Sequence, residues 1–147
     1  MSPFAIAASF VFYSIVGWFL DTAWRTLRKH RYTKGGFSKY PFSPIYGFGA
    51  LIAISLEPVL RTWALWLQWS FLSVLLGAFE YASGVMIVKT LRRRLWNYTD
   101  EPLDLEGHTT PYYALAWGAL ALLVIYVIQP GLETRCLDIP LCAAWLR

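Results

Sequence analysis

Three acidic residues, Asp21, Glu57 and Glu80, lie in or next to long apolar stretches of the sequence. A charged side chain at the centre of a bilayer costs about 2.5–3.5 kcal/mol on insertion scales, so an acid in such a stretch needs a partner or a function. Arg61 follows Glu57, and Arg25 follows Asp21, at the spacing of a helical ion pair. The sequence therefore predicts a structural ion pair at Glu57, and at Asp21 either an ion pair or a functional carboxylate.

Glu80 is the strongest candidate for a functional acid. The eight residues 81–88 separate it from the next basic residue, a rise of roughly 12 Å in a helix. Gly77 and Gly84 flank it at i−3 and i+4, which leaves its face of the helix open to close approach. Such a carboxylate should be protonated, hydrogen-bonded to another span or exposed to a polar cavity, so either a functional role or a satisfied packing hydrogen bond explains it. The predicted partners are hydroxyl groups on other apolar stretches: Tyr13, Ser14 and Tyr46.

The segment 41–49 combines two prolines with two glycines at the entry to an apolar stretch. The prolines restrict the chain and the glycines keep the backbone accessible, so we expect a bent mouth at the inner membrane surface. A ligand or ion path is then predicted from the acids, this mouth and the nearby small or hydroxyl residues. Its candidate members are Glu80, Asp21, Tyr46, Tyr13, Gly47 and Gly84.

The composition of the chain requires a membrane. Hydrophobic residues make up 57% of the 147 residues and charged residues only 15%, against about 45–50% and about 25% in globular proteins. A disordered tail, a collagen-like fibre and a disulfide-rich miniprotein are excluded by these values. A polytopic membrane protein remains.

Four apolar stretches approach the roughly 20 residues that a helix needs to cross the hydrocarbon. They are 4–24, 45–60, 62–88 and 111–129, and Pro130-Gly131 is expected to close the last. The first is too long for a cleavable signal peptide. The predicted fold is all-α: a bundle of four transmembrane helices over 1–130, with an interfacial inner loop, followed by a short external tail over 131–147.

The basic residues predict the orientation. Of the 13 Lys and Arg residues, six lie in 25–39 and four in 89–94. Both clusters directly follow apolar stretches, as cytoplasmic loops do, so we expect both termini to face outward. This pattern indicates contact with the lipid bilayer and argues against nucleic acid as a partner, despite the net charge of +4. The aromatic and acidic residues of 96–107 are expected to anchor the inner loop at the headgroups.

Small residues three or four positions apart form smooth strips where another helix can approach in lipid. The pairs are Ser14 with Gly17, Gly49 with Ala53, Ser73 with Gly77, and Ala114 with Gly118.

Motifs for several chemistries are missing from the sequence. There is no G-x-x-x-x-G-K-[ST] phosphate loop, no Gly-x-Ser-x-Gly elbow and no Cys/His cluster with zinc spacing. We therefore expect no ATPase activity in this chain, no cofactor and no metal. Cys136 and Cys142, in the predicted external tail, are expected either to form a disulfide or to remain free thiols.

Several motifs together resemble the Putative ABC-transporter type IV family, over about residues 10–130. The most specific are Pro44-Ile45-Tyr46-Gly47-x-Gly49 and Glu80-Tyr81-x-x-Gly84, supported by Tyr13-Ser14-x-x-Gly17-Trp18-x-x-Asp21 and Trp117-Gly118. The chain departs from the family pattern at Asp21, Tyr40, Asn97 and His108-Thr109-Thr110. The resemblance implies a small multi-pass protein of the bacterial cytoplasmic (inner) membrane, and the family name implies transport.

Three functions remain open on these observations. The first is a transporter-like or permease-type subunit with a polar site near Glu80. Because four spans are few for a complete carrier, that function implies a homo-oligomer or another membrane subunit. The second is a non-transporting scaffold or regulatory subunit that contacts lipid or a cytoplasmic partner. The third is an enzyme that acts on lipid headgroups.

Overall fold

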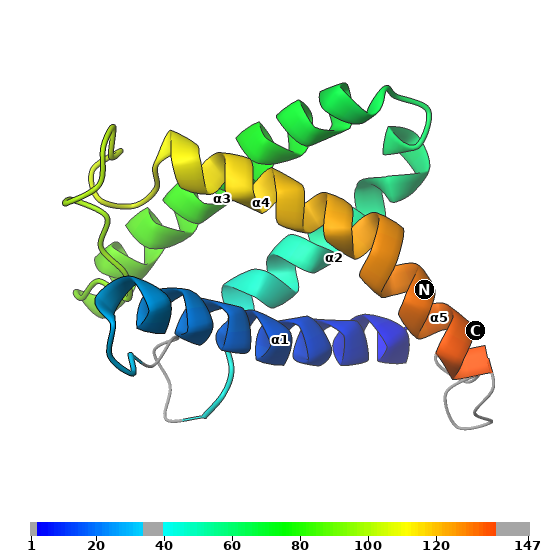
Figure 1. Cartoon of the computed structure of the whole chain (residues 1–147), viewed down its shortest axis with the longest axis horizontal. Coiled ribbons are helices and arrows are strands. Elements are labelled where there is room, and N and C mark those ends of the chain that lie inside the picture. The colour runs from blue at the N-terminus through cyan, green and yellow to red at the C-terminus, as the bar shows by residue number, and fades with distance from the viewer. Residues whose placement is uncertain (1–2, 34–39, 138–147) are drawn as a thin grey trace. The chain divides into compact units, whose positions relative to one another are not determined.

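The computed structural model describes residues 3–33 and 40–137, with the backbone alone for 135–137. This part of the chain is helical, without strands beyond one isolated bridge between Leu105 and Thr109. The elements are α1 (Pro3–Lys29), α2 (Pro44–Leu60), α3 (Leu65–Leu91), α4 (Pro111–Leu123), the π-helix η1 (Val124–Ile128) and α5 (Gln129–Leu137) (Figure 1).

In the described part of the chain, three helical stretches are long and apolar enough to cross a membrane: Pro3–Lys29, Leu65–Leu91 and Pro111–Thr134. The fourth apolar helix, α2, is shorter, with 17 residues. Many large apolar side chains are exposed, such as Val74 at 73% and Trp66 at 66%, which suits contact with lipid. The four helices fit the all-α membrane bundle that the sequence predicts.

Two helices extend further toward the basic segments than the predicted spans. α1 continues to Lys29, and His30 ends it with a φ of 48°, in the left-handed region. α3 continues to Leu91, and Arg92 ends it with a φ of 51°. Lys and Arg are good helix formers whose long side chains can reach headgroups, so a helix need not end where the apolar sequence ends.

The fourth helix does not end at Pro130-Gly131, as the sequence predicts. η1 ends at Ile128, two residues before the proline, and α5 continues to Leu137. A π-turn shifts the hydrogen-bond register, and Pro130 then lies in the first turn of α5, where its missing N–H costs little. The division at residue 130 between a membrane domain and an external tail stays a prediction.

The chain divides into two compact units, Met1–Ile52 with Ile128–Arg147 and Ala53–Val127. In the first unit, the beginning of α2 packs on α1. A Cβ on Gly17 would collide with the Tyr46 side chain, and one on Gly47 would collide with Ser14. The strip of Ser14 and Gly17 therefore receives α2, as small residues in lipid-embedded helices often do.

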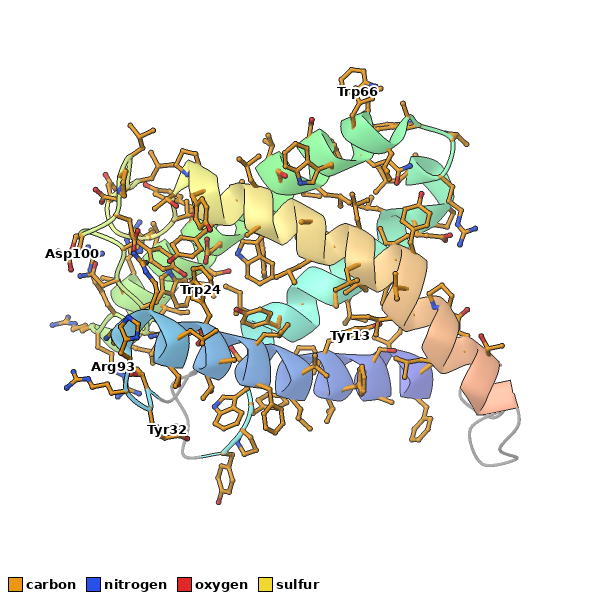
Figure 2. All side chains as sticks on the ribbon, viewed as in Figure 1. Tyr13, Trp24, Tyr32, Trp66, Arg93 and Asp100 are labelled. Atoms are coloured by element: carbon orange, nitrogen blue, oxygen red, sulfur yellow. The ribbon has the colours of Figure 1, made fainter. Side chains whose placement is uncertain are left out.

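In the second unit, α3 and α4 pack antiparallel through small residues. A Cβ on Gly77 would lie 2.6 Å from that of Ala114, and one on Gly118 would collide with Ser73. The two predicted strips on α3 and α4 thus face each other. Figure 2 shows Trp66 at one end of α3, with Arg93 and Asp100 beyond the other end.

Candidate functional site

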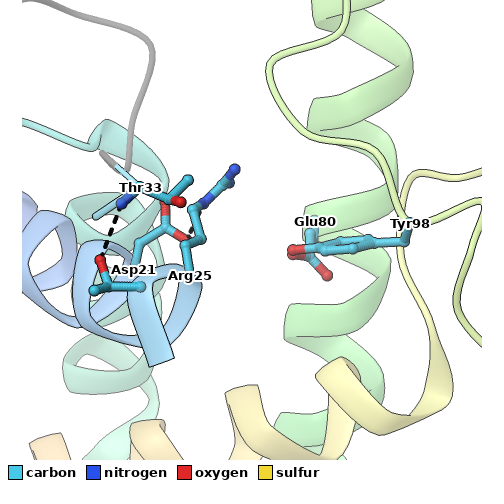
Figure 3. Close-up of polar contacts among 6 residues, drawn as sticks. Asp21, Arg25, Thr33, Glu80 and Tyr98 are labelled. Carbon is cyan, nitrogen blue, oxygen red and sulfur yellow. Dashed lines mark hydrogen bonds and ion pairs between the residues drawn. The ribbon is translucent and has the colours of Figure 1, made fainter. Parts of the chain in front are cut away.

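The Glu80 carboxylate is buried inside the second unit, with 4% of the residue exposed. The Tyr98 hydroxyl donates to its Oε1 at 3.1 Å, and the Thr109 hydroxyl donates to its Oε2 at 2.6 Å. Figure 3 shows the Tyr98 ring directed at the carboxylate. Both carboxylate oxygens therefore accept a hydrogen bond, which offsets the cost of burying them.

Both donors belong to residues 92–110, the connection between α3 and α4, which we call the cap. The cap folds on itself: the Tyr98 N–H donates to the Gly107 carbonyl at 3.0 Å, and the Leu105 N–H donates to the Thr109 carbonyl at 2.8 Å. The Trp96 indole N–H also donates to the His108 carbonyl at 2.7 Å. These bonds hold the Tyr98 and Thr109 hydroxyls at one point, although the residues are far apart in sequence.

Further contacts attach the cap to α3 and fix its turn. The Tyr81 hydroxyl donates to the Glu106 carboxylate at 2.8 Å. Arg94 donates to the Glu106 carbonyl at 2.8 Å. Glu106 has a φ of 52° and Gly107 a φ of 70°, so two successive left-handed residues make the tight turn. The cap is thus a structured element with its own hydrogen bonds.

The glycines beside Glu80 are filled by protein. Gly77 contacts Ala114, and a Cβ on Gly84 would lie 2.6 Å from Nδ1 of His108. His108 is buried, and its ring meets Tyr81 edge-on at 5.6 Å between centroids. The face that the sequence predicts to be open for close approach therefore receives α4 and the cap.

Asp21 forms an ion pair within α1. Its Oδ1 lies 2.8 Å from Nε of Arg25, and both side chains are partly exposed, at 16% and 30% (Figure 3). Glu57 pairs with Arg61 in the same way. Both ion pairs predicted from the i, i+4 spacing are confirmed. Whether Asp21 also serves a ligand path stays a prediction.

Tyr46 and Gly47 lie in the first turns of α2, packed on α1. The segment becomes helical at Pro44, and the Ser43 N–H before it donates to the Ser14 carbonyl at 3.0 Å. Phe10 adds an aromatic contact with Phe48, 4.8 Å between ring centroids. On the side that faces α1, the segment predicted to form a mouth is therefore the closely packed beginning of α2.

Tyr13 lies elsewhere in the first unit, where its hydroxyl donates to Oε1 of Gln129 at 2.9 Å. Of the six candidate residues, the structure brings Glu80 and Gly84 together in the second unit. Tyr46, Gly47, Tyr13 and Asp21 belong to the first unit. Contact of Tyr13, Ser14 or Tyr46 with Glu80 stays a prediction.

Sequence reasoning missed four polar residues of these sites: Tyr98 and Thr109 as donors to Glu80, and the amides of Gln68 and Gln129. Gln68 is buried, donates to the Trp63 carbonyl at 2.9 Å and accepts from the Tyr126 hydroxyl at 2.9 Å. Glutamines within apolar stretches are as visible in the sequence as the acids are. No local pattern in the sequence indicates that Thr109 and Tyr98 contact Glu80.

The remaining expectations concern the disulfide and a metal site. Cys142 lies outside the described residues, so the disulfide with Cys136 stays a prediction. Within residues 3–33 and 40–134, no group of three or more His, Cys, Asp or Glu side chains could hold a metal ion.

Comparison with known proteins gives one match. The family model described as Putative ABC-transporter type IV matches residues 8–146, nearly the whole chain. No curated protein and no solved structure matches significantly.

Proposed function

The chain belongs to the Putative ABC-transporter type IV family, and we propose that it is a permease-type membrane subunit with its polar site at Glu80. The observation that carries this proposal is the buried carboxylate of Glu80 in a helix apolar enough to cross a membrane. Ionisable residues in such helices are rare and mark substrate or ion pathways. Two hydroxyl donors hold this carboxylate in one position.

The chemistry of the site favours a ligand that is cationic or donates hydrogen bonds. A carboxylate is an acceptor, and the Tyr98 and Thr109 hydroxyls can rotate between donating to Glu80 and accepting from a ligand. A ligand that takes the place of one hydroxyl would leave the other bond intact. Tyr98 is the more replaceable donor, because its bond is longer, 3.1 Å against 2.6 Å for Thr109.

Transport by this chain requires further subunits. The sequence contains no phosphate loop, so energy from ATP must come from another protein. Four apolar helices are also few to enclose a solute path. We therefore propose that the chain works as a homo-oligomer or with another membrane subunit, in the bacterial cytoplasmic membrane.

The experiment compares Glu80→Gln, Glu80→Leu and the control Glu57→Gln in proteoliposomes, with flux measured for a panel of small cationic and neutral solutes. Glu80→Gln preserves shape and one acceptor oxygen, so it should fold normally and lose flux. Glu80→Leu should also lose flux without gaining stability. Glu57 pairs with Arg61 and is not a candidate member of the path, so Glu57→Gln should keep its flux and shows whether any change of charge in the spans has the same effect. Full flux in Glu80→Leu would show that Glu80 is a packing residue.

A second function, a non-transporting scaffold or regulatory subunit, is favoured by one observation. Ala114 and His108 fill the glycine positions on either side of Glu80, so the carboxylate could serve only to anchor the cap. In that case, no solute of the panel should cross with the native protein. Substitutions of exposed cap residues such as Asp100 should instead change which proteins co-purify with the chain.

The proposed orientation places both termini outside and the basic segments 25–39 and 89–94 inside. It follows from the distribution of Lys and Arg. Reporter domains that are active on only one face, fused to the C-terminus and inserted in the cap, should report opposite sides. A cytoplasmic signal from the C-terminal fusion would contradict this topology.

A further inference from the structure

The register of α4 on α3 shows how far the cap reaches along α3. Gly77 meets Ala114, and Ser73 meets Gly118. Because the helices are antiparallel, the first residue of α4, Pro111, lies level with Glu80. The 11 residues of α3 after Glu80 add about 16 Å of rise, and this length of α3 extends past the beginning of α4.

The cap occupies the space beside these last turns of α3. His108 packs on Gly84, Glu106 binds the Tyr81 hydroxyl, and Thr109 binds Glu80. The cap therefore lies beside α3 and does not merely extend from its end. In Figure 1 its ribbon turns back from the end of α3 to the beginning of α4.

The cap is too polar for hydrocarbon. Arg92, Arg93, Arg94, Asp100 and Glu106 are all exposed, and each such charge is costly in a bilayer. Its backbone is also non-helical, which a bilayer tolerates only where protein or water surrounds it. The cap, and the α3 turns that it flanks, must therefore lie in the headgroup or aqueous layer.

The length of α3 agrees with this placement. The 20 residues from Leu65 to Gly84 span about 30 Å, the thickness of the hydrocarbon. The apolar residues 85–88 then follow outside it, although hydropathy alone places the boundary near Lys89. Single apolar side chains such as Met86 are common on water-exposed surfaces.

We infer that the hydrocarbon boundary crosses α3 between Glu80 and Gly84, so that Glu80 is an interfacial site beneath a polar cap that lies in the headgroup or aqueous layer. The ligand class that matches this position is a water-soluble cation or hydrogen-bond donor, and not a lipid-soluble molecule. The inference deepens the function proposed above, because it concerns the same site. The position of the boundary does not itself depend on transport.

The test uses single cysteines in a Cys136→Ser, Cys142→Ser background, in lipid nanodiscs where both faces are accessible. Met86→Cys probes the turn of α3 that this inference places outside the hydrocarbon and that hydropathy alone places inside it. Val74→Cys, on the same helix within the hydrocarbon, is the matched control. Both are exposed apolar residues of α3, at 62% and 73%. Asp100→Cys, in the cap, is the aqueous reference. The measured quantity is the rate of labelling by a charged, membrane-impermeant maleimide.

We expect Met86→Cys to react within about tenfold of Asp100→Cys, and Val74→Cys about a hundredfold more slowly, because a charged reagent is excluded from hydrocarbon. Labelling after denaturation in detergent should be equal for all three. If Met86→Cys is as protected as Val74→Cys, the boundary lies beyond Met86 and the inference is wrong. No flux is measured, so this outcome is independent of the transport test.

Discussion

Asp21 and Glu80 are both acids in apolar helices, yet the chain stabilises them in different ways. Asp21 pairs with Arg25 one turn away on α1, and the pair is partly exposed. Glu80 accepts from Tyr98 and Thr109, 18 and 29 residues further along the chain, and is buried. The first arrangement needs only a helix, whereas the second needs a folded cap.

The difference predicts unequal energies. Exposed i, i+4 ion pairs contribute about 0.3–0.5 kcal/mol. A typical hydrogen bond contributes about 0.5–1.5 kcal/mol, and a buried polar group left without its partner costs about 1–3 kcal/mol. The neighbourhood of Glu80 should therefore respond strongly to substitution, and that of Asp21 weakly.

The largest effect is expected from the matched pair Glu80→Ala and Asp21→Ala. Glu80→Ala leaves two hydroxyls without their acceptor and should lower the free energy of unfolding by about 2–4 kcal/mol. Asp21→Ala should lower it by less than about 1 kcal/mol. Denaturant titration in mixed micelles measures both, and equal losses would remove the distinction between the two sites.

The glycines nearest the two acids provide the second comparison. Gly17→Ala meets the base of the Tyr46 side chain and Gly84→Ala meets the His108 ring. Overpacking of this kind costs about 1–3 kcal/mol. Gly17→Ala should cost more, because the atoms in its way lie close to the Tyr46 backbone and cannot move independently.

Gly131→Ala is the control for this pair, because nothing lies within 4 Å of its added Cβ. It should be neutral or stabilising by up to about 1 kcal/mol, from helix propensity alone. Thermal unfolding in detergent measures all three variants. A loss at Gly131 as large as at Gly17 would mean that close packing is not the cause.

A third, smaller effect separates the two donors to Glu80. Tyr98→Phe and Thr109→Val each remove one hydroxyl and should cost about 1–1.5 kcal/mol in the native protein. Each should cost less in a Glu80→Leu background, where the acceptor is already gone. Thr109→Ser keeps the hydroxyl and is the control. Hydrogen exchange of the cap amides should rise with each loss, and additive costs would argue against the shared carboxylate.

The smallest effect belongs to Asp21→Asn. It should lower the free energy of unfolding by about 0.5 kcal/mol or less at low salt, and the loss should shrink as salt screens the ion pair. Glu80→Gln, whose site is buried, should show little salt dependence. A salt-independent loss at Asp21 would show that its carboxylate has a buried role as well.

The sequence by itself determined the helices, the α1 and α2 ion pairs and the small-residue strips on α1, α3 and α4. These depend on local pattern: about 20 apolar residues make a spanning helix, i, i+4 charges lie on one face, and small residues allow backbones to approach. The boundaries of α2 were predicted to within one residue, because Pro44 marks its beginning.

Only the tertiary structure decided what surrounds Glu80. The sequence indicates that the Glu80 carboxylate needs hydrogen-bond donors. It does not indicate which hydroxyl groups, far along the chain, supply them. Tyr98 and Thr109 meet because the Glu106–Gly107 turn and the α3–α4 register bring them to one point. The same holds for η1, where the Tyr126–Gln68 bond is formed across the helix pair. Long-range contacts of this kind follow from the folded backbone and not from any spacing along the chain.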